Sequence, residues 1–246
     1  MRKTKHWLMT IAALLCSVAV SAHDFEVSGI YYKITSYREV AVTYRGDSNN
    51  NLYDDEYSGV VSIPSSVTYN GTTYSVTSIG EEAFLRSSLT GVTIPTSVTS
   101  IEQYAFQLCT ELTSITIPNG VKRIEWAAFI DCTSLVEVTI PNSVTYIGGR
   151  AFSYCYKLEK VNMGNGVTTI DNYAFWQCPI KELTLSNTLT TIGIGAFCQG
   201  EFEQITLPST LTTISEEAFY GCKKLTNITI PDNVTEIPNR AFYNCI

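Results

Sequence analysis

Cysteine is the residue type whose number and spacing in this sequence could most directly support chemistry. The sequence has eight cysteines. Cys16 falls in an N-terminal leader described below, which leaves seven in the mature chain, and one of these, Cys198, directly follows Phe197. Thiolates bind metals and oxidise to disulfides. No C-x-x-C pair occurs, and the mature set is odd, which argues against zinc ligation and a complete disulfide framework. The other six each stand three residues after a phenylalanine or its repeat equivalent: Cys109, Cys132, Cys155, Cys178, Cys222 and Cys245.

Two arrangements of these thiols are open from the sequence. If the chain stacks in coils, the cysteines form a column with a spacing of about 5 Å and parallel Cα–Cβ bonds. A disulfide instead needs β-carbons about 3.8 Å apart and inclined toward each other. We therefore expect buried, unpaired thiols that pack as small apolar side chains. The alternative is one or two disulfides between neighbouring coils, such as Cys109–Cys132.

A polar stretch near the N-terminus begins like a calcium-binding loop, with oxygen-bearing side chains at Asp47, Asn49 and Asn51. Such a loop needs glycine at its sixth position and a bidentate glutamate at its twelfth. Leu52 and Ser58 stand there instead. We therefore expect a solvated polar loop and no bound metal.

The sequence contains no recognisable catalytic constellation. His6 and His23 are its only histidines, and no G-x-S-x-G, H-E-x-x-H or phosphate-binding loop motif occurs. The carboxylate pairs Glu81–Glu82 and Glu216–Glu217 recur at the same place in a repeat, as exposed turn residues do. We therefore predict that the protein is not an enzyme and needs no cofactor.

Charge and the N-terminal segment indicate where the protein acts. The 246 residues include 16 Lys and Arg against 23 Asp and Glu, so the formal charge is −7, which argues against binding nucleic acid through its phosphates. Residues 1–22 read as a Sec signal peptide, with a basic start, an uncharged apolar run and small residues at Ser21 and Ala22. The run is short for a bilayer span. We expect a secreted or cell-surface protein without a transmembrane span in its mature chain.

A repeated Ala-Phe pair is the strongest pattern in the sequence. Its spacing of 22 or 23 residues is typical of a solenoid. One unit runs from Leu112 to Cys132 and contains a short alternating strand that ends at Pro118, because proline cannot donate to a strand ladder. A single coil cannot bury its own apolar side chains, whereas stacked coils can. The pairs begin at Ala83, Ala105, Ala128, Ala151, Ala174, Ala196, Ala218 and Ala241.

We therefore predict a β-rich repeat solenoid over residues 61–246, with about eight repeats of 22 to 23 residues, the last one incomplete. Residues 23–60 do not repeat and read as strands in hairpins, which we expect to form a β-hairpin cap over the first coil. Asn70-Gly71 is a strong signal for a two-residue hairpin turn. Because the last repeat stops at Ile246 without a cap, we expect either that the natural chain continues or that another element covers this end.

The outward-facing strand residues form the predicted binding surface. One column is almost uniformly threonine, and its neighbour varies in charge, as a surface adapted to a partner would. The residues expected to contact a partner are Thr116, Glu137, Thr139, Lys160, Asn162, Glu182, Thr184 and Gln204. A further set of aromatic residues lies near the Ala-Phe pairs, and we expect most of them to cover the turns of the next coil: Trp126, Tyr154, Tyr156, Trp176, Tyr220 and Tyr243.

The repeat, in outline SVTSIG-x-x-AF-x-x-C-x-x-LTSVTIP, resembles the BspA-type leucine-rich repeat of surface proteins from host-associated bacteria and some protists. The resemblance covers residues 61–246 and is clear in Ser97 to Pro118 and in Ser143 to Met163. It implies a right-handed leucine-rich-repeat superhelix at the cell surface with no catalytic residues. Characterised relatives are adhesins, which implies a protein ligand such as a host extracellular-matrix or plasma protein. Two alternatives stay open: a spacer that presents another domain, and a glycan-binding protein that uses exposed aromatic residues.

Overall fold

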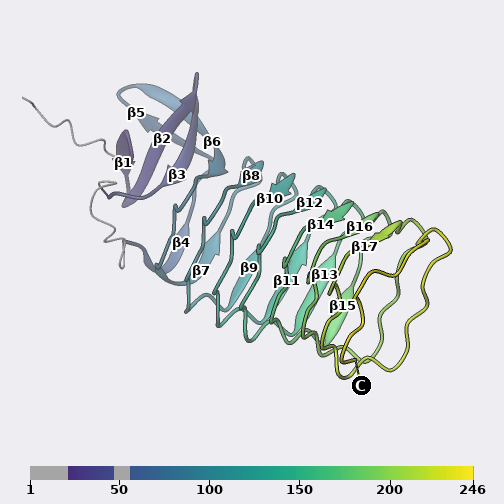
Figure 1. Ribbon diagram of the computed structural model, residues 1–246. Helices are drawn as coiled ribbons and strands as arrows, with labels where there is room; N and C mark the ends of the chain where they lie inside the picture. The colour runs from purple at the N-terminus through teal and green to yellow at the C-terminus, as the bar shows by residue number, and fades with distance from the viewer. Residues whose placement is uncertain (1–21, 47–55, 246) are drawn as a thin grey trace, which may run out of the picture.

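The computed structural model describes residues 22–46 and 56–245, and over these ranges the chain forms a stack of β coils without a helix (Figure 1). Two rows of short parallel strands run along the stack on opposite sides of each coil. One row contains β8 (Ser100–Ile101), β10 (Arg123–Ile124), β12 (Tyr146–Ile147), β14 (Thr169–Ile170), β16 (Thr191–Ile192) and β17 (Thr213–Ile214). The other contains β9 (Ser114–Thr116), β11 (Glu137–Ile140), β13 (Lys160–Met163) and β15 (Glu182–Thr184).

The parallel strands pair residue for residue across successive repeats. In one row Ile124 lies opposite Ile101 and Ile147, and in the other Val138 lies opposite Val161. Because the same residue type returns at the same height in each coil, every apolar side chain lies over its equivalent in the next. The repeat solenoid predicted from the Ala-Phe period is therefore confirmed.

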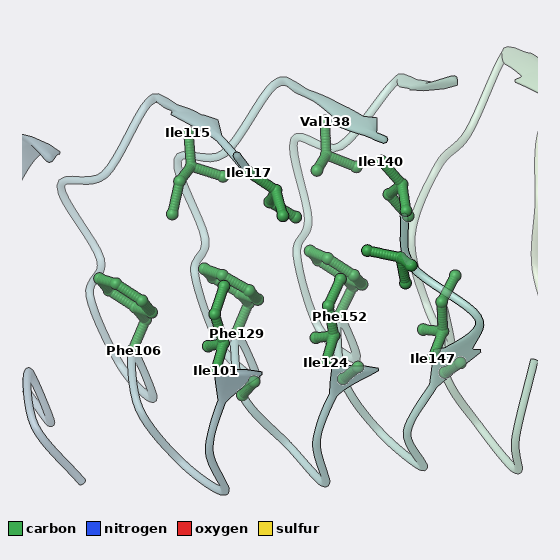
Figure 2. Packing of buried hydrophobic residues seen from close by; sticks show 14 of the residues in the cluster. Ile101, Phe106, Ile115, Ile117, Ile124, Phe129, Val138, Ile140, Ile147 and Phe152 are labelled. Carbon is green, nitrogen blue, oxygen red and sulfur yellow. The ribbon is translucent and has the colours of Figure 1, made fainter. Parts of the chain in front are cut away.

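A continuous file of phenylalanine rings fills the centre of the stack. Phe106, Phe129 and Phe152 are fully buried, and their ring centroids lie 4.9 and 5.0 Å apart with interplanar angles of 5° and 3°. Figure 2 shows these rings between the inward side chains of the two strand rows. The file contains Phe84, Phe106, Phe129, Phe152, Phe175, Phe197, Phe219 and Phe242.

The Ala-Phe segments form a third hydrogen-bonded connection between coils, which we call the Ala-Phe ladder. The amide of Phe129 donates to the carbonyl of Ala151 at 2.7 Å, and that of Phe152 donates to Ala174 at 2.7 Å. The residue before each Ala, and the second residue after each Phe, have left-handed backbone conformations, such as Arg150 with φ of 57°. These left-handed residues let the Ala-Phe segment point its amides and carbonyls toward the neighbouring coils without forming an ordinary strand.

The N-terminal strands pair with the same long sheet. β1 (Phe25–Val27), β2 (Ile30–Ser36) and β3 (Glu39–Thr43) are antiparallel neighbours, and β3 pairs in parallel with β6 (Thr72–Ile79). β5 (Ser66–Tyr69) and β6 form an antiparallel hairpin. Its turn is Asn70-Gly71, with φ of 48° and 75°, so the predicted hairpin is confirmed.

One tyrosine connects this sheet with the phenylalanine file. The Tyr57 ring meets Phe84 edge-on at 4.8 Å, and its hydroxyl donates to the carbonyl of Thr43 at 2.6 Å. Directly after Tyr57, β4 (Ser58–Ser62) pairs in parallel with β7 (Ser88–Thr93). These contacts support the expected cap, although the cap itself and its boundary at residue 60 stay predictions. The expected signal peptide and the stretch from 47 to 55 lie outside the described residues, apart from Ala22.

Candidate functional site

The predicted binding residues lie mostly on one four-stranded sheet, built from β9, β11, β13 and β15. We call its outer surface the β9–β15 face. Its threonine column consists of Thr116, Thr139, Asn162 and Thr184, which lie opposite one another in register. Its charged column consists of Glu137, Lys160 and Glu182, also in register. Gln204 lies beyond this sheet and forms an isolated bridge with Asn227.

Alternation along each strand exposes these side chains and buries the residues between them. Glu137 and Thr139 of β11 are exposed, whereas Val138 between them is buried. Lys160 and Asn162 of β13 are half-buried around the buried Val161. This pattern follows from the two-residue period of a strand, which sends every second side chain into the core.

The charged column is an exposed network that contributes little to folding. Lys160 Nζ lies 3.2 Å from Glu182 Oε2. The residues directly before these two form a second pair, in which Lys181 Nζ lies 2.6 Å from Glu159 Oε1. Solvent-exposed ion pairs of this kind stabilise a fold by about 0–1 kcal/mol each. These charges are therefore available to a partner at little cost to the fold.

Threonine hydroxyls along the stack differ in whether the fold uses them. Thr145, Thr168 and Thr190 directly precede β12, β14 and β16. Each donates its Oγ1 to a backbone carbonyl of the preceding coil, that of Lys122, Thr145 and Thr168, at 3.3, 3.1 and 2.9 Å. On the β9–β15 face, the hydroxyls of Thr116, Thr139 and Thr184 have no protein partner among the described residues. A hydroxyl without a partner in the fold remains free to donate to and accept from a ligand.

The cysteine column is buried and its thiols donate weak hydrogen bonds. Cys132 Sγ donates to the carbonyl of Phe106 at 3.2 Å, and Cys109 Sγ donates to Phe84 at 3.0 Å. Burial raises the pKa of Cys109 to about 12, which keeps the thiol protonated and inert. All seven cysteines in the described residues are free. The expectation of unpaired thiols is confirmed, and that of burial is confirmed for all of them except the half-buried Cys245. The alternative of a Cys109–Cys132 disulfide is wrong.

The remaining features to locate are the calcium-like stretch, clusters of possible metal ligands and membrane-spanning helices. Asp47, Asn49, Asn51 and Leu52 of the calcium-like stretch lie outside the described residues. Over residues 22–46 and 56–245, no three His, Cys, Asp or Glu side chains gather in a group that could hold a metal ion. In the same ranges, no helix is long and apolar enough to cross a bilayer.

Aromatic residues gather along the Ala-Phe ladder. Tyr154 lies 5.0 Å from Trp176 and 5.9 Å from Tyr156. The expectation that such rings cover neighbouring turns is confirmed for Tyr154 and Trp176, whereas Tyr156 is 52% and Trp126 38% exposed. Sequence reasoning missed that Arg150 and Tyr173 join this group, because both precede an alanine of the repeat and their side chains meet those of a neighbouring coil.

The sequence matches the profile of the BspA type leucine rich repeat region in six copies, over residues 77–202 and 190–246. The chain belongs to this family. BspA-type repeat proteins are typically found at the cell surface, and their repeats are typically non-catalytic and mediate protein interactions. No curated protein matches the chain significantly.

Solved structures of leucine-rich-repeat proteins from T. pallidum and Eubacterium ventriosum share this fold. The leucine-rich-repeat protein from T. pallidum is 27% identical, with a TM-score of 0.57, and the match covers 82% of this chain and 79% of that chain. One from Eubacterium ventriosum is 28% identical, with a TM-score of 0.64, over 74% of this chain and 50% of that chain. One from Bacteroides ovatus is 28% identical over 91% of this chain and 69% of that chain, with a TM-score of 0.48.

Proposed function

We propose that this protein is secreted or displayed at the cell surface, where it binds another protein through the β9–β15 face and catalyses no reaction. The observation that carries the proposal is the row of unused hydroxyls on this face. The fold uses the hydroxyls of Thr145, Thr168 and Thr190 elsewhere in the stack, whereas those of Thr116, Thr139 and Thr184 have no protein partner among the described residues. Beside them lies a column of alternating charge, Glu137 and Lys160.

Rigidity makes this face suited to binding. Its backbone is held by parallel ladders on both sides of β11 and β13, and the side chains beneath it are packed in the core. Binding of a partner therefore costs this face little further conformational entropy, because its backbone is already ordered in the folded protein. Open hydroxyls and alternating charges favour a polar partner surface with complementary charges.

The family supports an adhesin-like role, with a host or neighbouring-cell protein as the partner. We propose an extracellular-matrix or plasma protein as the ligand class, since this is what characterised relatives bind. The expected signal peptide in residues 1–22 supports export.

The test reverses the charged column and measures binding to immobilised extracellular-matrix and plasma proteins by biolayer interferometry. The variant carries Glu137→Lys, Lys160→Glu and Glu182→Lys. Its control carries Glu216→Lys, Lys122→Glu and Glu236→Lys, three exposed charges away from the face that give the same change in net charge.

We expect the first variant to lose at least tenfold in affinity for any protein that the natural chain binds, and the control to keep it. Equal binding by the two variants would show that the β9–β15 face is not the interface. If the natural chain bound none of these proteins, the adhesin-like role would be wrong and the spacer role would be favoured.

A further inference from the structure

We propose that Arg150 and the rings of Tyr154, Tyr156, Tyr173 and Trp176 form a second binding site, which takes a carboxylate side chain flanked by an aromatic group on a protein ligand. We call it the Arg150 site. It lies on the Ala-Phe ladder and shares no residue with the β9–β15 face. The choice of a protein as its ligand rests on the proposed function, whereas the geometry of the site does not.

The fold fixes the backbone of this site through left-handed residues in successive coils. Arg150, Tyr154 and Tyr173 have φ of 57°, 62° and 60°. The amide of Arg150 donates to the carbonyl of Asn172 at 3.0 Å, and that of Tyr154 donates to Trp176 at 2.9 Å. These hydrogen bonds join neighbouring coils, so the side chains meet at positions set by the stack.

The rings orient the guanidinium of Arg150. Its Cζ lies 5.2 Å from the ring centroid of Tyr173 and 5.5 Å from that of Trp176. Those two rings lie 5.7 Å apart and tilted. Arginine binds aromatic faces by cation–π attraction, and its planar fork keeps its N–H groups free to point away from the rings.

Arg150 has this aromatic platform but no anionic partner. Arg123 also lies over a ring, at 4.0 Å from the centroid of Tyr146, yet its Nε lies 2.6 Å from Glu125 Oε1. For Arg150, no side-chain hydrogen bond or ion pair occurs among the described residues. An oriented guanidinium with unused donors matches a carboxylate, which it can bind through two parallel hydrogen bonds.

The surroundings of Arg150 supply apolar contact surface. Tyr156 is about half exposed, and the Trp126 ring lies against Gly149, next to Arg150. A β-carbon at Gly149 would come within 2.5 Å of Trp126 Cζ3, so glycine is needed for the ring to lie there. Trp, Tyr and Arg are the residues most enriched among binding hot spots. A ligand that covers these rings would bury the Arg150 charge and so must bring an anion to it.

The test follows the indole N–H signals of Trp126 and Trp176 by NMR in the full chain, with each signal assigned from a Trp→Phe variant. The probe is an acetylated and amidated Gly-Phe-Glu-Phe-Gly peptide, and its matched control has Gln in place of Glu. We expect saturable shifts of the Trp176 signal with the Glu peptide and an affinity at least about tenfold lower for the Gln peptide.

Two arginine variants separate the site from general charge. Arg150→Gln should weaken binding of the Glu peptide at least about tenfold, whereas Arg123→Gln should leave it unchanged. Arg150→Lys keeps the charge but loses the planar fork, so it should also weaken binding. Circular dichroism and the melting temperature confirm that each variant is folded.

Three results would overturn the proposal: no shift with the Glu peptide, equal affinity for the two peptides, or shifts that survive Arg150→Gln. Shifts with glucuronate but not with the Glu peptide would assign the site to acidic sugars and overturn the protein ligand. The triple charge reversal at Glu137, Lys160 and Glu182 should leave these shifts unchanged, so the two proposals, the Arg150 site and the β9–β15 face, are tested separately.

Discussion

Removing one ring from the middle of the phenylalanine file should cost much of the protein's stability. Phe152 is fully buried and stacks on Phe129 at 5.0 Å and on Phe175 at 5.2 Å, with interplanar angles of 3° and 2°. A Phe→Ala change in a core costs about 3–5 kcal/mol. Because two ring–ring contacts worth about 0.5–1.5 kcal/mol each are among the interactions lost, we expect the free energy of unfolding to fall by the upper part of this range, about 4–5 kcal/mol.

A matched change in the same column gives the control. Phe242 is half-buried and stacks on one ring of the file, Phe219, at 5.2 Å. Phe242→Ala should therefore cost about 1–2 kcal/mol. Guanidinium unfolding followed by circular dichroism measures both. A loss below about 1 kcal/mol for Phe152→Ala, or equal losses for the two variants, would refute the view that the stacked rings hold the coils together.

Three further predictions concern the thiols, the hydroxyls and pH. Native protein at pH 8 should react with iodoacetamide fastest at Cys245, the one half-buried thiol of the seven, and labelling of Cys132 at the same rate would contradict the buried column. Thr168→Val should lower the unfolding free energy by about 0.5–1.5 kcal/mol through loss of its bond to Thr145, whereas Thr139→Val should change it little, as urea titrations would show. Burial raises the pKa of Cys109 to about 12, and also raises those of Cys132 and Cys155, so the folded chain holds protons that the unfolded chain releases above about pH 8.5. Stability should therefore be full below that pH and fall as pH rises toward 12; a constant guanidinium midpoint between pH 7.5 and 10.5 would contradict this.

The repeat period was sufficient to predict the interior of the stack. Ala-Phe at a constant interval places each ring over the next, and Asn70-Gly71 encodes its own turn. The left-handed residues of the Ala-Phe ladder were not predictable in this way. Tyr104, Arg150 and Tyr173 have positive φ without being glycine or asparagine, because hydrogen bonds to the adjoining coils hold them there.

The irregular coil around Cys198 shows another limit of reading each repeat by itself. Gly200 stands where six other coils have cysteine and the first has Ser87, and a β-carbon there would lie 2.4 Å from Phe202 Cε1. Phe202 lies edge-on between Phe197 and Phe219, at 6.4 and 6.3 Å. Glycine therefore makes room for an added core ring whose contacts come from two coils, which no single repeat reveals.

The candidate site was predictable in its columns but not in its hydrogen bonding. Strand alternation placed Thr139 and Glu137 on the outer face, as their exposure on either side of the buried Val138 confirms. Whether a threonine hydroxyl is used by the fold depends on the backbone carbonyl of the preceding coil. The hydroxyl of Thr168 donates to such a carbonyl, that of Thr145, whereas the hydroxyl of Thr139 has no partner among the described residues, although both are surface threonines of the repeat.

Photo-crosslinking can show whether the protein binds its partner through the β9–β15 face. Benzoylphenylalanine is placed at Thr139 on this face, or at Lys122, which is exposed on the other side of the stack beside β10. After irradiation with a bound extracellular-matrix or plasma protein, we expect a covalent adduct from position 139 and none from position 122. An adduct from position 122 alone, or none from position 139 while the partner remains bound, would contradict it.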